Sequence, residues 1–143
     1  MKDFNMNQIE SMIEYAKSFV GSPYSWGGSN PLSGWDCSGF IQEVLTSVGL
    51  DPKGDQTSQG LYNHFSSKPY LEKIQAGSLV FYGASSLEIK HVALCINNFQ
   101  IIEAAGGGSR TKSIRDAMSD NAFVRVRPVK YRSDFFQSLF TFI

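Results

Sequence analysis

Cys37 is the residue of this sequence best placed for chemistry, because a glycine-rich loop turns into a predicted helix at that point. It lies in the run Trp-Asp-Cys-Ser-Gly-Phe at positions 35–40. The first turn of a helix presents unpaired N–H groups and the positive end of the helix dipole, which both favour a thiolate. Cys37 is therefore predicted to be a nucleophile with a lowered pKa, and Gly39 to leave room for a substrate. The alternative is a small buried cysteine at a helix entry.

A thiolate nucleophile requires a basic partner, and the sequence contains two histidines, His64 and His91. His91 begins the apolar run Val92–Ile96, which is typical of a strand. His64 lies in a polar segment with helical spacing and is interpreted as a solvated residue. His91 is therefore the candidate partner of Cys37, although a histidine at a strand end is often an ordinary edge residue.

Glu103 follows His91 by twelve residues, across a predicted turn at positions 97–98. In an antiparallel hairpin, a two-residue turn would place these two side chains on opposite faces of the sheet. A three-residue loop at 97–99 instead makes them diagonal neighbours on one face, with small Ala93 opposite Glu103. Glu103 would then orient the imidazole. The alternative is a solvated glutamate at the rim of the sheet.

Together these residues resemble the NlpC-type cell-wall peptidases, a compact branch of the papain-like cysteine peptidases. The resemblance rests on Tyr-Ser-Trp-Gly-Gly at 24–28, Asp-Cys-Ser-Gly-Phe at 36–40, His-Val-Ala at 91–93 and the polar Glu103. It covers roughly Ile9 to Arg127. It implies an α+β, papain-like fold, in which the catalytic cysteine begins a helix that packs on an antiparallel sheet carrying His91 and Glu103.

The resemblance also implies catalytic roles. Cys37 would be the nucleophile and His91 its partner. Glu103 would orient His91, and Tyr24 would lie beside the thiolate. Two positions depart from the common pattern: Glu103 stands where the family more often has histidine, and Ser78 stands where relatives often have aspartate. A carboxylate still orients an imidazole and favours its protonated form, so we expect the site to be competent.

Substrate binding is implied at Asp36 and Ser38, which in relatives help the tyrosine to hold the free amino end of the peptide. The charge of Asp36 suits an ammonium group, and the same residue is a candidate N-cap of the helix. Trp26 and Trp35 are expected to line the groove, although like Tyr82 they suit a core equally well.

The elements that position these residues are predicted helices followed by predicted strands, which is typical of an α+β domain. Apolar residues at 9, 12, 13, 16 and 20 share one face of a first helix, with Asn7 and Glu10 as a capping box. A second helix follows Cys37 and is closed by Gly49, and a third is expected over 57–65. Strands are predicted at 78–82, 91–96, 100–104 and 122–127, and the glycine run at 106–108 is expected to form the rim of the site.

The C-terminal segment Tyr131–Ile143 is unusually apolar and lies beyond the resemblance. Its large apolar residues recur at helical spacing and predict a short amphipathic helix: Phe135, Phe136, Leu139 and Phe140. We expect this segment to pack on its own domain. The alternative is self-association or docking onto a larger assembly, because large exposed apolar patches favour association.

Length and composition limit the class of protein. The 143 residues, 42% of them hydrophobic, predict one domain over 1–143 with a core at about 7–127. Thirteen basic residues balance thirteen acidic ones, which argues against nucleic-acid binding. No apolar run reaches the length of a membrane span, and Cys37 and Cys95 are expected to be free thiols. No metal or other cofactor is expected, because the cysteines and histidines match no zinc motif.

The candidate residues predict a thiol protease that hydrolyses amide bonds, and the resemblance implies that these bonds lie in the stem peptides of bacterial peptidoglycan. The resemblance places the bond between D-glutamate and the diamino acid, with a thioester intermediate. The alternatives are an N-acetylmuramoyl-L-alanine amidase, an acyltransferase with the same dyad, and a non-catalytic module of the same fold. The first twenty residues show no secretory signal, so we expect synthesis in a cytoplasm. Delivery as a phage lysin, a phage tail component or an injected antibacterial effector would then bring the protein to the wall.

Overall fold

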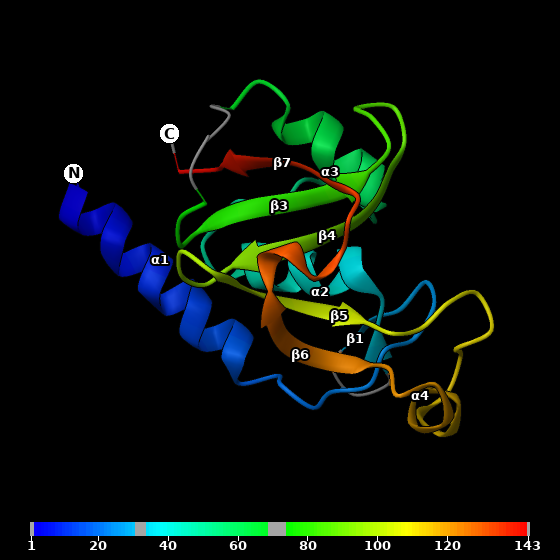
Figure 1. Ribbon diagram of the computed structural model, residues 1–143. Coiled ribbons are helices and arrows are strands. Elements are labelled where there is room, and N and C mark those ends of the chain that lie inside the picture. The colour runs from blue at the N-terminus through cyan, green and yellow to red at the C-terminus, as the bar shows by residue number, and fades with distance from the viewer. Residues whose placement is uncertain (1, 31–33, 69–73, 143) are drawn as a thin grey trace.

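The computed structural model describes residues 2–30, 34–68 and 74–142 (Figure 1). The helices are α1 (Lys2–Lys17), α2 (Cys37–Thr46), α3 (Ser58–Phe65) and α4 (Ile114–Asp120), with a 3-10 helix, η1 (Val129–Tyr131). The strands are β1 (Ser29–Asn30), β2 (Gly34–Trp35), β3 (Ser78–Gly83), β4 (Ile89–Cys95), β5 (Gln100–Ala105), β6 (Phe123–Pro128) and β7 (Phe135–Phe140). Each of the four predicted strands is therefore present, within two residues of its expected bounds.

A five-stranded antiparallel sheet, in the order β6-β5-β4-β3-β7, forms the centre of the molecule. Helix α2 packs against β4 and β5, and α3 packs against β4, behind the sheet as it is drawn in Figure 1. Helix α1 packs in turn against α2. The predicted α+β arrangement is confirmed, because α2 begins at Cys37 and lies on an antiparallel sheet that carries His91 and Glu103.

Apolar side chains bury both faces of the central strands β3 and β4. Between the sheet and the helices, the main core includes fully buried residues from both layers: Met12, Phe40, Leu45, Leu61, Phe81 and Leu94. The opposite face carries a smaller buried cluster: Val80, Tyr82, Ala93, Cys95, Ile101 and Val129. Because side chains alternate along a strand, His91 shares this second face with Ala93 and Cys95.

The hairpin between β4 and β5 has the register that a three-residue loop requires. Cys95 pairs with Ile101, and continuing this register places Ala93 opposite Glu103. Side chains of a period-two strand then put His91 and Glu103 on one face as diagonal neighbours. The sequence is compatible with two loop lengths. The structure has the three-residue loop, whose register places His91 and Glu103 on the same face, as a catalytic pair requires.

Asn97 fixes this loop. Its Oδ1 accepts hydrogen bonds from the backbone N–H groups of Phe99 and Gln100, each at 2.8 Å. The N–H of Ile96 donates to the carbonyl oxygen of Gln100 at 3.0 Å and closes the hairpin. Asparagine is favoured in such turns because its side-chain oxygen binds backbone donors a few residues further on.

The ends of the first helix differ from the prediction. Helix α1 begins before Asn7, so Asn7 and Glu10 lie inside it and do not cap it. The helix ends at Lys17, and Val20 lies beyond it with 53% of its surface exposed, so Val20 is not part of the buried face. Apolar spacing identifies the face of a helix but not its ends, which explains both errors.

The C-terminal segment forms strand β7, so the predicted helix is wrong. Strand β7 pairs with β3, with Leu139 opposite Leu79 and Phe135 opposite Tyr82. The register shifts between these two pairs, which makes Phe136 an extra residue and interrupts the alternation of side chains. This irregularity produces an apolar spacing that resembles the spacing of a helix.

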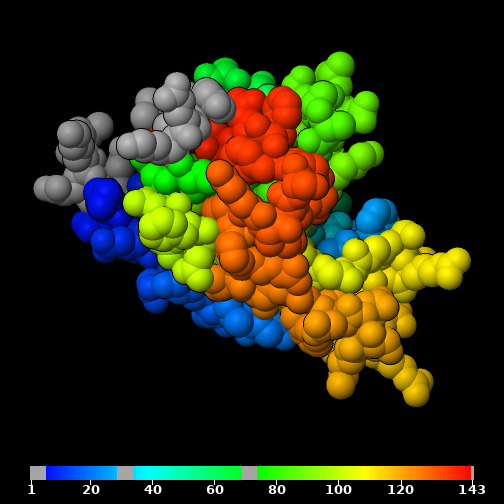
Figure 2. Space-filling view, in the orientation of Figure 1, coloured from blue at the N-terminus to red at the C-terminus, as the bar shows by residue number. Residues whose placement is uncertain are grey.

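The segment packs on its own domain, as expected. Leu139 is fully buried in the main core, and Phe136 packs against the same core. Figure 2 shows the residues of β7 (red) lying against those of η1 (orange) on one face of the molecule. The pairing also satisfies backbone N–H and C=O groups of β3, which would be an edge strand without β7. Ile143 lies outside the described part of the chain.

We expect Leu139→Ala to lower the free energy of unfolding by about 2–5 kcal/mol, because it removes a fully buried side chain of β7. The control is Val126→Ala on β6, the other edge strand, where 38% of the residue's surface is exposed and the expected loss is below about 1 kcal/mol. Urea unfolding measures both changes. Similar small losses in the two variants would contradict the packing of β7 into the core.

Candidate active site

Asp36 caps helix α2 and thereby fixes Cys37 at its first position. Asp36 Oδ1 accepts hydrogen bonds from the Gly39 N–H at 2.8 Å and from the buried Ser38 hydroxyl at 3.2 Å. Asp36 Oδ2 accepts from the Gly27 N–H at 3.1 Å. Burial raises the pKa of Asp36 above its ordinary value and outweighs these three donors, which lower it. The predicted N-cap role is confirmed.

Gly39 and Gly28 let the loop before α2 lie close to the helix. The Asp36 N–H donates to the carbonyl oxygen of Gly28 at 3.1 Å. A Cβ atom at Gly39 would overlap that same oxygen. The space beside Gly39 is therefore filled by the chain itself, so the expectation that this glycine leaves room for a substrate is wrong. The motifs at 24–28 and 36–40 form one packed unit.

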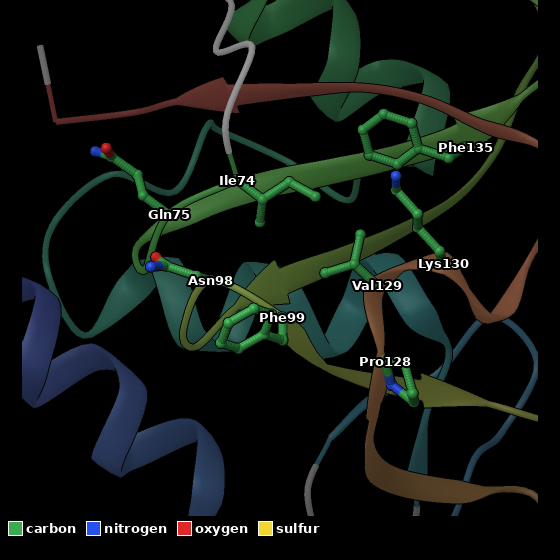
Figure 3. A pocket seen from close by; sticks show the side chains of 8 residues that line it. All are labelled: Ile74, Gln75, Asn98, Phe99, Pro128, Val129, Lys130 and Phe135. Carbon is green, nitrogen blue, oxygen red and sulfur yellow. The ribbon is translucent and has the colours of Figure 1, made fainter.

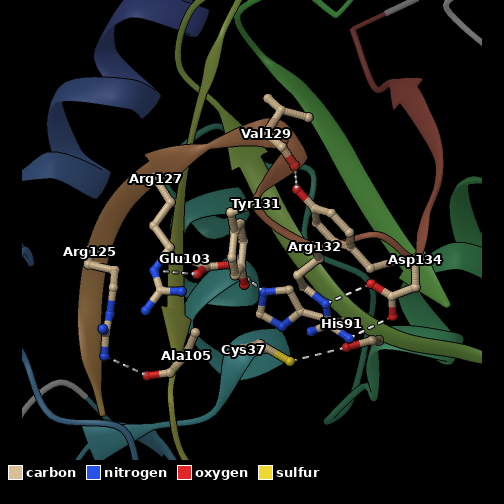
Figure 4. A network of polar contacts seen from close by, with 12 residues as sticks. Cys37, His91, Glu103, Ala105, Arg125, Arg127, Val129, Tyr131, Arg132 and Asp134 are labelled. Atoms are coloured by element: carbon tan, nitrogen blue, oxygen red, sulfur yellow. Dashed lines mark hydrogen bonds and ion pairs between the residues drawn. The ribbon is translucent and has the colours of Figure 1, made fainter. Parts of the chain in front are cut away.

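Cys37, His91 and Glu103 lie next to one another at the site (Figure 4). His91 Nε2 and Glu103 Oε1 are 2.6 Å apart, and both residues are buried, with 5% and 0% of their surfaces exposed. This contact leaves the other ring nitrogen, Nδ1, for the hydrogen bond between His91 and Cys37. The Sγ atom of the partly buried Cys37 also lies 3.2 Å from the Ser58 hydroxyl. The structure thus brings together the three residues that the sequence predicted as a set.

The surroundings favour the charged forms of both Cys37 and His91. Burial alone would raise the pKa of the Cys37 thiol, but the hydrogen bond and charge of His91, together with the Ser58 hydroxyl, bring that pKa below its ordinary value. Burial likewise opposes a charge on His91, whereas Cys37 and Glu103 raise the pKa of His91 to about 9. These contacts favour a thiolate paired with an imidazolium over a neutral thiol and a neutral imidazole.

A cavity of about 430 Å³ leads to Cys37, and Tyr24 and Trp26 line it. Burial, followed by the charges of Cys37 and Asp36, raises the pKa of Tyr24, so its hydroxyl stays protonated and able to donate. Gly107 also lines the cavity, and a Cβ atom there would overlap the Tyr24 ring. The glycine run therefore forms part of the rim, as the sequence predicted.

Trp35 does not line the groove, which corrects one prediction. It has no exposed surface, and its ring packs edge-to-face on Phe19 with the centroids 4.8 Å apart. Trp26 by contrast is 54% exposed at the cavity. Tyr82 is fully buried too, and its hydroxyl donates to the Val129 carbonyl at 2.6 Å. Trp35, on strand β2, faces the core next to α2, whereas Trp26 lies in a loop at the cavity.

Three residues that the sequence analysis did not single out contact the predicted set. The Tyr131 hydroxyl donates to Glu103 Oε1 at 2.7 Å, and Arg127 Nε lies 3.6 Å from Glu103 Oε2. Ser58, at the start of α3, is the hydroxyl beside Cys37. None of them belongs to a motif, and only the tertiary fold brings them to the site.

A larger cavity, of about 830 Å³, lies on the outer face of the sheet (Figure 3). Its wall is mainly apolar and includes Ile74, Phe99, Val129 and Phe135. None of the candidate catalytic side chains lines this cavity. The smaller cavity is therefore the candidate active site.

Both cysteines, Cys37 and Cys95, are free thiols. Within residues 2–30, 34–68 and 74–142, no three histidine, cysteine, aspartate or glutamate side chains gather as a set of metal ligands. No helix in this part of the chain is long and apolar enough to cross a membrane.

The sequence is similar to one family and to several of its curated members. A model of the NlpC/P60 family matches residues 21–128. The bifunctional muramidase/DL-endopeptidase CwlT of Bacillus subtilis is 31% identical over 114 residues, covering 78% of this chain and 33% of CwlT. The peptidoglycan endopeptidase RipB of Mycobacterium tuberculosis is 34% identical over 117 residues, covering 71% of this chain and 45% of RipB. The chain thus spans less than half the length of either relative.

Solved structures show the same fold. The NlpC/p60 domain of the peptidoglycan hydrolase SagA superposes with a TM-score of 0.68 at 25% identity, covering 92% of this chain and 97% of that domain. The structure of RipB from Mycobacterium tuberculosis gives a TM-score of 0.67 at 28% identity, covering 94% of this chain and 64% of that structure.

We expect Ser58→Ala to raise the pKa of the Cys37 thiol, because the variant loses a hydroxyl that stabilises the thiolate. The rate of alkylation by iodoacetamide as a function of pH measures this pKa. Cys95 does not interfere, because it is fully buried and its pKa is raised to about 11, chiefly by burial.

The control is Ser66→Ala, which removes an exposed hydroxyl at the opposite end of α3. Its alkylation profile should equal that of the unchanged protein. The same profile in Ser58→Ala would contradict a role for Ser58 as a donor to the thiolate.

Proposed function

We propose that this chain, which belongs to the NlpC/P60 family, is a cysteine peptidase that hydrolyses amide bonds in the stem peptides of bacterial peptidoglycan. The observation that carries the proposal is the reactive pair itself. Cys37 begins a helix and has a lowered pKa, and His91 is held against it by a contact of 2.6 Å to the buried Glu103. The named activities of CwlT and RipB, both endopeptidases, support the reaction class.

Each step of this reaction has a residue to perform it. Cys37 Sγ attacks the carbonyl carbon, and the oxyanion accepts hydrogen bonds from the Cys37 backbone N–H and from the Tyr24 hydroxyl. His91 donates its proton to the leaving amine as the C–N bond breaks, which leaves a thioester on Cys37. His91 then removes a proton from water, the water oxygen attacks the thioester, and the thiolate leaves as the carboxylic product forms.

Glu103 takes the third position of the site in this proposal. It keeps the imidazole in one orientation and compensates the positive charge that His91 carries before the amine leaves. It is the residue that most relatives are expected to replace with histidine. A carboxylate there stabilises the imidazolium more strongly than a neutral imidazole would, because it carries a full opposite charge.

The proposed bond lies between D-glutamate and the diamino acid of the stem peptide. The name DL-endopeptidase, given to CwlT, supports this assignment. The free amino end of the peptide would meet Asp36 Oδ2, which has one protein donor, the Gly27 N–H, whereas Oδ1 has two. Ser38 is buried against Asp36, so it would act by holding that carboxylate. Trp26, exposed at the cavity, would cover the bound peptide.

The peptidoglycan endopeptidases among the relatives support the bacterial wall as the place of action. Delivery by a phage particle, by lysis or by injection stays a prediction from the sequence, because the fold bears on the reaction and not on the route.

We expect Cys37→Ala to abolish the release of stem-peptide fragments from purified peptidoglycan and to leave the melting temperature nearly unchanged, because the thiol is held for reactivity. Mass spectrometry of the soluble products identifies the new termini. Cys95→Ala is the matched control, because it removes the other thiol from a buried position away from the cavity. Turnover by Cys37→Ala at the level of the control would remove the mechanism. Products ending between the sugar and L-alanine would identify an amidase instead.

We expect Glu103→Gln to retain part of the activity and to move the alkaline limb of the pH profile to lower pH. The imidazolium donates the proton to the leaving amine, and it is lost as the pH rises through the His91 pKa of about 9. The carboxylate of Glu103 helps to raise that pKa, so an uncharged amide lets the proton leave at a lower pH. Glu103→Ala should lose more activity, because it also loses the hydrogen bond. An alkaline limb that stays in place in both variants would contradict this role for Glu103.

A further inference from the structure

Tyr131 contacts the carboxylate that orients His91, although it lies outside every motif of the sequence. Its hydroxyl donates to Glu103 Oε1 at 2.7 Å, the same oxygen that meets His91 Nε2 at 2.6 Å. Burial and the hydrogen bond to Glu103 raise the pKa of Tyr131, so the hydroxyl keeps its proton and remains a donor. One carboxylate oxygen therefore has two donors, one from the tyrosine and one from the imidazolium.

The other oxygen of Glu103 is held much less firmly. Oε2 is buried and makes no hydrogen bond with the described residues, and Arg127 Nε lies 3.6 Å from it. The charge of Arg127 attracts the carboxylate away from His91, towards β6. Without the hydroxyl of Tyr131, the carboxylate would be free to rotate towards Arg127 and lengthen its contact with His91.

Several contacts hold Tyr131 in place. Its ring lies under the guanidinium of Arg127, with 4.6 Å between the guanidinium carbon and the ring centroid. The turn η1 that carries it is bound through the Val129 carbonyl, which accepts from the Tyr82 hydroxyl at 2.6 Å. The chain then continues into β7, next to the ion pair of Arg132 and Asp134 at 2.7 Å (Figure 4).

We propose that Tyr131 is a positioning residue that holds the Glu103 carboxylate against His91 and thereby keeps the imidazolium protonated. The inference rests on the proposed function for its kinetic consequences, but the positioning itself is a property of the resting site. This role adds to the packing of the apolar C-terminal segment on the core, because the pairing of β7 with β3 anchors the chain that follows Tyr131.

The charge on His91 depends on all the groups that surround it. Cys37 and Glu103 hydrogen-bond to it. The other titratable and charged groups about the site come from β3, β4, β6, η1, the segment before β7 and the side of α2: Tyr82, Lys90, Arg125, Arg127, Tyr131, Arg132, Asp134, Tyr24 and Asp36. Arg132 and Asp134 neutralise each other, and the remaining cations, Lys90, Arg125 and Arg127, disfavour the imidazolium. Glu103 must therefore stay close to His91 for the imidazolium to persist.

The test is Tyr131→Phe, which removes the hydroxyl and keeps the ring. We expect kcat on a soluble stem peptide to fall about tenfold, the effect of losing one hydrogen bond to a charged group. KM should change little, and the alkaline limb should move to lower pH. The matched control is Tyr62→Phe, which removes a tyrosine hydroxyl that bonds Gln137 of β7 at 3.2 Å, away from the site. The control should keep the wild-type limb even if its melting temperature falls.

A double variant separates positioning from mere stability. If Tyr131 acts through Glu103, Tyr131→Phe added to Glu103→Gln should shift the alkaline limb no further than Glu103→Gln alone. A further shift in the double variant, or a wild-type limb in Tyr131→Phe, would overturn the proposal.

Alkylation of Cys37 by iodoacetamide gives the same information without a peptide substrate, because the reactivity of the thiolate changes when His91 loses its proton. The inflection at alkaline pH should move to lower pH in Tyr131→Phe and stay in place in Tyr62→Phe. A protein that shows this shift but releases no stem peptides would refute the proposed function and leave the positioning role standing. An unshifted inflection in Tyr131→Phe would refute the positioning role.

Discussion

The site depends on one constraint, which is that the Glu103 side chain needs polar partners in a place with no exposure to solvent. A buried charge without compensation is strongly unfavourable, so such a group has to be paired or hydrogen-bonded. His91 and Tyr131 meet the requirement at one oxygen, and Arg127 approaches the other. Removing one partner from a buried pair typically costs about 3–5 kcal/mol, which makes the arrangement of these four residues a condition of the fold as well as of the chemistry.

This constraint also applies to the backbone that carries Glu103 and His91. Glu103 and His91 meet only if the β4–β5 hairpin keeps its register, because a slip of one residue would turn one of the two side chains to the other face of the sheet. Asn97 holds the register because its side-chain Oδ1 accepts two hydrogen bonds from backbone N–H groups of the loop. On the other side of the cavity, the contact of Gly28 with Gly39 fixes the start of α2 and so the place of Cys37.

The parts of this site that the sequence could predict are those that local pattern determines. Cys37 follows a capping residue at a helix start, and the period of two along a strand reduced the placement of Glu103 to a choice between two loop lengths. Tyr131 could not be found in this way, because its contact with Glu103 spans 28 residues and depends on the path of the chain after β6. The burial of Trp35 and the strand at 135–140 were missed for a related reason, since core packing and a bulged pairing with β3 decided them.

Cys37 on α2 and His91 on β4 also stabilise each other's charged form. Burial opposes a thiolate at Cys37 and an imidazolium at His91, yet the pKa of the thiol is lowered and that of the imidazole is raised to about 9. Both shifts have the same cause, because each charge is compensated mainly by the other. Glu103 adds to the effect by raising the pKa of His91 further. The fold thus favours a thiolate at Cys37 without any substrate, because it brings a helix start and a hairpin face together around this residue.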